Sequence, residues 1–196
     1  MLGDTDDYLT SMTDRNGNKL TITVDASGNV TSITDTAGRI TNITYNGLSN
    51  TNKRISYITD PIGRVTYYYY DPSYRLNQVK DPSGSSTYYT YTSDGYLAAV
   101  KDNTNNTVIE SFTYKTPQGE TLPKLETSTD RLNLAQTYEY DTSEGSVKAT
   151  DSKGRVTTTW FDKSLYPIRT IDAEGRETSD TTFHSSFRQS FRLIAG

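Results

Sequence analysis

The feature that most constrains this chain is a spacing of aspartates that repeats every 21 residues. The tetrad Asp-x-x-Gly recurs along the sequence, and the aspartates in phase with it step alternately by 11 and 10 residues. A fixed period in this range is typical of architectures that stack one small supersecondary unit many times. The clearest series are Asp60, Asp71 and Asp81, and Asp151, Asp162 and Asp172.

Each tetrad has the composition of a tight turn. In Asp60-Pro61-Ile62-Gly63, the aspartate can accept local backbone amides, proline presets φ, and glycine takes a positive φ. This pattern predicts a type I turn followed by a left-handed residue, which is a common hairpin connection. The residues predicted to build such turns are Asp35, Gly38, Asp60, Pro61, Gly63, Asp71, Asp81, Gly84, Asp151, Gly154, Asp162, Asp172 and Gly175.

The segments between turns, such as residues 64–70, are six or seven residues long and rich in Val, Thr and Tyr. Such segments are typical of strands. Two strands and two turns per period make a hairpin, so about eight units predict roughly sixteen strands. The predicted fold class is therefore all-β: an antiparallel β-hairpin repeat meander that forms a curved, shell-like sheet. A bulge at each turn glycine would reset the face alternation and curve the sheet.

Composition supports a thin sheet. Leu, Ile, Val and Phe make up about 18% of the chain, while there are 16 Tyr and 33 Thr, so the apolar material is largely aromatic and β-branched. Aliphatic content this low argues against a thick core. The repeat phase divides the chain into an N-terminal lead-in at 1–13, the repeat array at 14–183 and a non-repeat tail at 184–196, with extra residues after Tyr45 and around Thr116.

The bulk numbers exclude several classes of function. Zero Cys and one His rule out disulfide scaffolds, thiolate sites and multi-His metal sites. The net charge of -4 is dispersed and gives no basic stripe, so nucleic acid is not expected as a partner. No apolar run is long enough to span a membrane. The acidic start, with Asp4, Asp6 and Asp7, is unlike a signal peptide, so any export signal is expected outside this segment.

The repeated carboxylates invite a catalytic or a calcium-binding interpretation, but their spacing favours turn capping. Neither Asp14 to Asn18 nor the acidic start completes a calcium loop. His184 is the only imidazole, and Ser185 and Ser186 beside it do not make a triad. We therefore expect no enzyme activity, no cofactor and no metal.

Tyrosines gather in consecutive repeats. If the hairpins stack, they would form an aromatic ladder that either stabilises the sheet through cross-strand pairs or offers a platform for sugar rings or an apolar partner surface. The residues of the predicted ladder are Tyr67, Tyr68, Tyr69, Tyr70, Tyr88, Tyr89 and Tyr91.

The pattern Asp-x-x-Gly-Arg-x-Thr-x-x-x-Tyr-Asp, present at 60–71 and in varied form at 151–162, resembles the YD repeat of the RHS repeat family. That family includes bacterial polymorphic toxins, wall-associated contact-inhibition proteins, insecticidal toxin complex subunits and teneurins. The resemblance covers residues 14 to 183. It implies a β-strip that spirals into a hollow shell, a toxic C-terminal domain held inside, and a secreted or cell-surface setting. Fuller members of the family close the shell with a core segment that carries self-cleavage aspartates in a run of DPxG motifs. This chain does not show that segment.

Two functions of different classes follow. In the first, the chain is a structural segment of a shell that scaffolds or encloses toxic cargo, with the remainder of the shell and the encapsulated toxin domain as partners. In the second, it is a carbohydrate- or cell-surface-binding module whose tyrosine ladder holds glycan. A shell segment should also self-associate through its open sheet edges.

Overall fold

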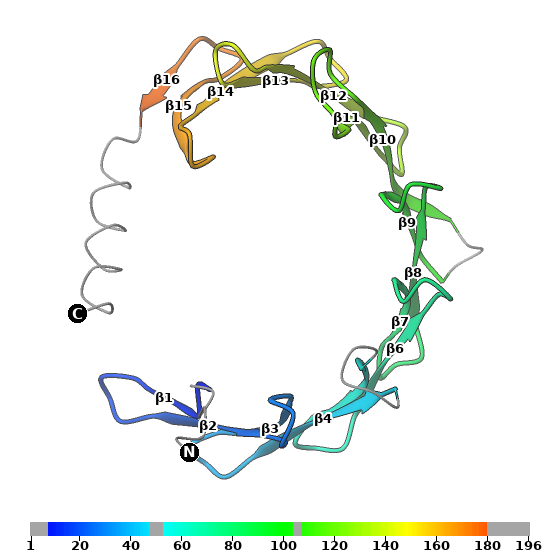
Figure 1. Cartoon of the computed structure of the whole chain (residues 1–196), viewed down its shortest axis with the longest axis vertical. Coiled ribbons are helices and arrows are strands. Elements are labelled where there is room, and N and C mark those ends of the chain that lie inside the picture. Colours follow the sequence, from blue (N-terminus) through cyan, green and yellow to red (C-terminus); the bar gives the residue numbers. More distant parts are fainter. Residues whose placement is uncertain (1–7, 48–52, 104–106, 180–196) are drawn as a thin grey trace, which may run out of the picture. The chain divides into compact units, whose positions relative to one another are not determined.

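The computed structural model describes residues 8–47, 53–103 and 107–179, and within these residues every regular element is a strand. Sixteen described strands follow one another in sheet order β1 to β16, and neighbouring strands run antiparallel (Figure 1). The predicted all-β antiparallel meander is confirmed. The first strands are β1 (Ser11–Thr13), β2 (Lys19–Val24), β3 (Val30–Thr34), β4 (Ile40–Asn46), β5 (Arg54–Thr59), β6 (Val65–Tyr70), β7 (Leu76–Lys80) and β8 (Ser86–Tyr91).

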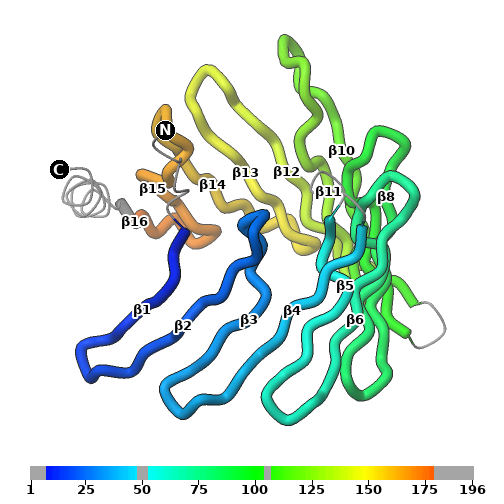
Figure 2. The backbone as a smooth tube through the Cα atoms, turned by 60° about the horizontal axis from the view of Figure 1, so that its bottom comes forward, coloured from blue at the N-terminus to red at the C-terminus, as the bar shows by residue number. Residues whose placement is uncertain are grey.

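The chain divides into two compact units, residues 1–90 with 101–107 and residues 91–100 with 108–196. Each unit, taken by itself, is a curved layer of strands one sheet thick (Figures 1 and 2). The remaining strands are β9 (Leu97–Lys101), β10 (Val108–Lys115), β11 (Lys124–Asp130), β12 (Ala135–Asp141), β13 (Ser146–Thr150), β14 (Val156–Phe161), β15 (Pro167–Ile171) and β16 (Glu177–Ser179).

Successive turns alternate between the two long edges of the sheet. In the first unit the turns that join β1 to β2, β3 to β4 and β5 to β6 lie along one edge (Figure 2). This layout is the direct result of the 11/10 spacing, because each half-period supplies one strand and one reversal. The aspartates of one repeat therefore lie a strand length apart.

The layer has almost no interior. Among the described residues only Ala99, Ser86 and Ser146 are buried, and no large side chain is fully buried. Stability must therefore come from backbone ladders, turn hydrogen bonds and partly buried cross-strand pairs rather than from a packed core.

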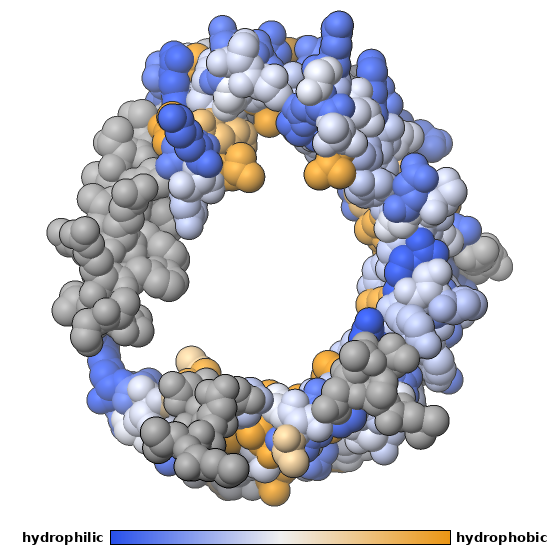
Figure 3. Space-filling view, in the orientation of Figure 1, coloured by the Kyte–Doolittle hydropathy of each residue, from blue (hydrophilic) through white to orange (hydrophobic). Residues whose placement is uncertain are grey.

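The two faces of the sheet differ in chemistry because side chains alternate along each strand. One face, here called the apolar face, carries opposed pairs such as Ile22–Ile33, Ile43–Ile58 and Tyr68–Val79. The other, the polar face, carries pairs such as Thr23–Ser32, Thr127–Thr137 and Glu139–Lys148. Apolar side chains gather on one side of the layer in each unit (Figure 3).

At least five of the described strands contain a bulged residue that has no partner opposite it on the preceding strand. Each bulge lies within three residues of the start of its strand and shifts the register there. These bulges are separate from the positive-φ glycines of the turns. The alternation of side chains between the two faces is therefore reset inside the strands as well as at the turns. The bulged residues are Thr31, Ser56, Asn77, Glu126 and Ile168.

The predicted division of the chain stays a prediction. A strand already forms at Ser11–Thr13, within the segment interpreted as lead-in, and the tail at 184–196 lies outside the described residues. In the described part of the chain, no helix of the length and apolarity needed to cross a membrane occurs.

Candidate functional site: aspartate turns and tyrosine faces

The turn that begins at Asp60 shows how one carboxylate organises a hairpin. Its Oδ1 accepts the backbone N–H groups of Ile62 at 3.0 Å and Arg64 at 2.8 Å. Its backbone carbonyl accepts the N–H of Gly63 at 3.0 Å, and its own N–H donates to the Arg64 carbonyl at 2.9 Å. Gly63 has φ +85°. The Arg64 guanidinium contacts the second carboxylate oxygen at 2.6 Å.

The same two hydrogen bonds, to the amides two and four residues on, recur through the array. Glycine has a positive φ at the fourth position in most of these turns, and Pro61 occupies the second position of the turn that begins at Asp60. Tyr74 and Leu165 take that left-handed conformation instead, with φ of 61° and 62°. The aspartates of the predicted set that accept both bonds are Asp35, Asp60, Asp71, Asp81, Asp151, Asp162 and Asp172, and the fourth-position glycines are Gly38, Gly63, Gly84, Gly154 and Gly175.

Hydrogen bonding favours the charged form of several of these carboxylates. The backbone amide and side chain of Arg155 lower the pKa of Asp151 below its usual range, and those of Arg39 do the same for Asp35. A charged group already satisfied by local donors has little remaining capacity to bind a ligand. In the described part of the chain, no three acidic or histidine side chains are grouped to hold a metal ion.

The alternative calcium site at Asp14 has the same turn geometry. Asp14 Oδ1 accepts the amides of Asn16 and Asn18, and the Asn18 side chain donates to its other oxygen at 2.8 Å. The acidic start at Asp4, Asp6 and Asp7 lies outside the described residues.

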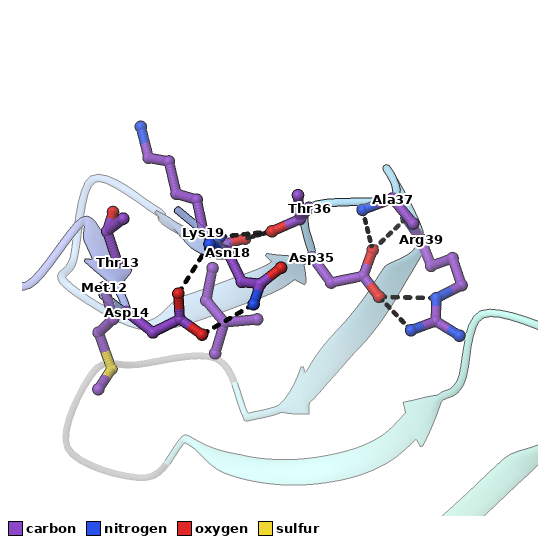
Figure 4. A pocket seen from close by; sticks show the side chains of 10 residues that line it. Met12, Thr13, Asp14, Asn18, Lys19, Asp35, Thr36, Ala37 and Arg39 are labelled. Carbon is purple, nitrogen blue, oxygen red and sulfur yellow. Dashed lines mark hydrogen bonds and ion pairs between the residues drawn. The ribbon is translucent and has the colours of Figure 1, made fainter. Parts of the chain in front are cut away.

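A shallow pocket lies in the first unit between the β1–β2 turn and the β3–β4 turn (Figure 4). The Asp14 carboxylate faces Asn18, and the Asp35 carboxylate faces Arg39 at 2.6 Å. Thr36 bridges the two turns through the backbone of Lys19. Because its carboxylates are paired within their own turns, the pocket presents no free acid–base pair.

The predicted tyrosine ladder is divided between the two faces. Tyr68 and Tyr70 lie opposite Val79 and Leu76 on the apolar face, and strand alternation places Tyr89 and Tyr91 on the same face. Tyr67 and Tyr69 lie opposite Lys80 and Gln78, and Tyr88 lies opposite Gln78 as well. The sequence run therefore supplies two separate surfaces. Whether either one binds a ligand stays a prediction.

The polar-face tyrosines form a contiguous cluster that also includes Tyr57. The Tyr57 and Tyr67 rings are 5.8 Å apart, and Tyr67 stacks on Tyr69 at 6.5 Å with 27° between the planes. Tyr67 and Tyr69 are 40% and 44% exposed. The Gln78 amide bonds Ser86 at 3.0 Å beside them. Sequence reasoning missed Tyr57, although its place one strand before Tyr67 in the repeat could have identified it.

Three tyrosines of the apolar face use their hydroxyls in the backbone network. Tyr45 donates to the Val30 carbonyl, Tyr70 to that of Ile55 and Tyr114 to that of Leu97, each at 2.9 Å. Burial raises the pKa of all three phenols. Their hydroxyls therefore remain protonated donors at neutral pH.

His184, with Ser185 and Ser186, lies outside the described residues. Within the described residues, the aspartates with a lowered pKa lie in the turns, where hydrogen bonds from backbone amides and side chains of the same turn lower it.

Comparison with known proteins gives likeness of fold only. No family model and no curated protein matches the chain. A structure of the Photorhabdus luminescens Tc holotoxin pore is similar, with a TM-score of 0.51 and 13% identity over 86% of this chain and 9% of that chain. Two crystal structures of TcdB2-TccC3 assemblies align with TM-scores of 0.41, at 15% and 17% identity, over 86% and 87% of this chain and 10% and 11% of theirs. The chain thus spans about a tenth of the length of the solved chains it matches.

Proposed function

We propose that this chain, a member of the RHS/YD-repeat family by its repeat spacing and its fold, is a structural wall segment of a shell that encloses the toxic cargo of an exported toxin. The observation that carries the proposal is the single-layer repeat sheet: its turn carboxylates are occupied by their own backbone, and its fold matches a chain of the Tc holotoxin pore. A surface built this way separates two spaces, and its described turn carboxylates are held by hydrogen bonds within their own turns.

The proposed partners and setting follow from the same likeness. A wall one sheet thick cannot bury its apolar face against itself, so that face requires neighbours. We propose that these are the remainder of the shell and the enclosed toxin domain. A toxin shell acts outside the cell that makes it, so the setting is secreted or cell-surface. The role is structural rather than enzymatic.

Protease protection tests the enclosing role. The native reading frame that contains this segment would be expressed whole and digested with a broad-specificity protease, beside a version in which Asp60→Ala and Asp151→Ala weaken two turns. We expect the downstream domain to survive in the first protein and to be cleaved sooner in the second. A downstream domain that is cleaved equally fast in both, or a frame with no downstream domain, overturns the enclosing role.

A second candidate function rests on the polar-face tyrosines. Exposed, stacked rings beside the Gln78 amide and the Tyr88 hydroxyl have the chemistry of a carbohydrate platform, in which rings cover sugar faces and neutral polar groups bond hydroxyls. Binding of the chain to insoluble polysaccharides would be measured for Tyr67→Ala and Tyr69→Ala, with Tyr68→Ala on the opposite face as the matched control. Binding that falls only in the polar-face variants supports this function. Equal binding, or no binding by the parent chain, removes it.

A further inference from the structure

The ladders between strands end early wherever the first of the two strands is bulged. In β5 the bulged residue is Ser56, and the β5–β6 ladder stops at the pair Tyr57–Tyr67 although β6 continues to Tyr70. In β3 the bulged residue is Thr31, and the β3–β4 ladder likewise has only three pairs. The bulge therefore turns the start of its strand away from the next strand.

A tyrosine hydroxyl spans the gap that results. Ile55 lies beyond the last β5–β6 pair, and its carbonyl accepts the Tyr70 hydroxyl from the far end of β6. Val30 stands in the same place in β3, and its carbonyl accepts the Tyr45 hydroxyl. In both hairpins the bonded carbonyl belongs to the residue directly before the bulged one. The side chain thus supplies the donor that the interrupted ladder does not.

One hairpin provides the opposite case. The β12–β13 pairing has no register shift, so β13 is not bulged, and the β13–β14 ladder runs through five pairs to Ser146–Trp160. The residue at the tyrosine position is Phe161, which has no hydroxyl. Its backbone N–H bonds the Gly145 carbonyl at 2.9 Å. In this hairpin the backbone ladder continues to the strand end, and the residue at the tyrosine position has no hydroxyl.

We infer that Tyr45 and Tyr70 are bridging residues whose hydroxyls hold each bulged strand to its partner, so that the sheet keeps its bend at that point without losing the strand end. The bulge and the hydroxyl act together. The bulge interrupts the ladder and bends the strand, and the tyrosine hydrogen bond limits how far the two strands separate. The Tyr114 hydroxyl donates to the Leu97 carbonyl in the same way. This role is local and does not depend on whether the strip encloses cargo.

The first test is Tyr70→Phe in the full chain, with amide hydrogen exchange as the readout. We expect exchange at Ile55, Ser56 and Tyr57 to become about fivefold to tenfold faster, which is the effect of losing one partly buried hydrogen bond. The β2–β3 hairpin should be unchanged. The matched control is Tyr68→Phe, on the same strand and face, because the Tyr68 hydroxyl makes no hydrogen bond within the described residues. Equal exchange in the two variants overturns the inference.

The second test removes the bulge itself. Deleting Ser56 leaves Ile55 and Ile58 on their present face, because the bulge places two residues opposite one. The ladder can then extend as it does in β13–β14. In this background Tyr70→Phe should no longer alter exchange. An undiminished effect would show that the hydroxyl is not tied to the bulge.

The third variant, Phe161→Tyr, keeps the inference falsifiable if the deletion does not fold. The Gly145 carbonyl already has its backbone donor, so an added hydroxyl should leave exchange at Gly145 and Ser146 unchanged. Protection raised there by about fivefold or more would mean that the hydroxyl acts at any strand end, and would refute the coupling to bulges.

Discussion

The turns at Asp60 and Asp162 reach the same backbone conformation with different residues. Each aspartate accepts the amides two and four residues on, and each fourth residue donates to the aspartate carbonyl. The first turn has glycine at the left-handed position and the second has Leu165, which is 81% exposed with φ 62°. The carboxylate is thus the constant part of the turn, and the hairpin imposes a positive φ even on a side chain that disfavours it.

The largest expected effect on stability comes from removing the turn carboxylate. Asp60→Ala deprives two backbone amides and Arg64 of their acceptor, and we expect the melting temperature to fall by roughly 5 °C. Asp162→Ala should act in the same direction. Asp94→Ala is the control, because Asp94 accepts only a long bond from Ser93. An equal loss in the control would show that the carboxylate does not define the turn.

Exchanging the fourth residues tests the strained position directly. Leu165→Gly should stabilise the chain by somewhat under about 1 kcal/mol, because glycine adopts a positive φ freely but also gains freedom in the unfolded chain. Gly63→Leu should cost about 1–2 kcal/mol, and this cost reflects backbone conformation, since a Cβ at Gly63 would meet nothing within 4 Å. Chemical denaturation measures both. A loss of stability in Leu165→Gly, or no loss in Gly63→Leu, would contradict the comparison.

Acid should weaken the turns whose carboxylates are bonded most strongly. The Asp151 pKa is lowered in the folded chain. The contribution of this carboxylate to folding stability is therefore fully present above the ordinary aspartate pKa of ~3.9 and is lost as pH falls through the lower folded value. We expect the melting temperature to decline below about pH 4. Asp151→Asn should melt lower than the parent at pH 7 and show a shallower acid decline. An identical pH dependence in the two proteins would exclude this carboxylate as a contributor.

The smallest effect is expected from the guanidinium of the first turn. Arg64 is largely exposed, and its ion pair with Asp60 lies on the surface, where such pairs contribute little. Arg64→Lys keeps the charge and the backbone amide, so the melting temperature should change by only about 1 °C. A fall in melting temperature as large as that of Asp60→Ala would show that the guanidinium, rather than the backbone amides, is the main partner of the Asp60 carboxylate.

Much of the fold could be predicted because its signals are local. The carboxylate, proline and glycine of residues 60–63 encode a turn within four residues, and the regular spacing encodes a meander. The candidate site was less predictable. The run Tyr67 to Tyr70 predicts one ladder, whereas cross-strand register assigns Tyr67 and Tyr68 to opposite faces with different neighbours.

The sequence by itself determined the number of strands, their order and the hydrogen-bonding chemistry of each turn, because these depend on residues only a few positions apart. Tertiary structure alone decided where the ladders are bulged, which carbonyl each tyrosine hydroxyl reaches, and that Leu165 adopts a left-handed conformation. Tyr70 and Ile55 are fifteen residues apart, and their contact exists only after two strands have paired in one register. Pairing free energy shared along a whole hairpin overrides the preference of a single residue.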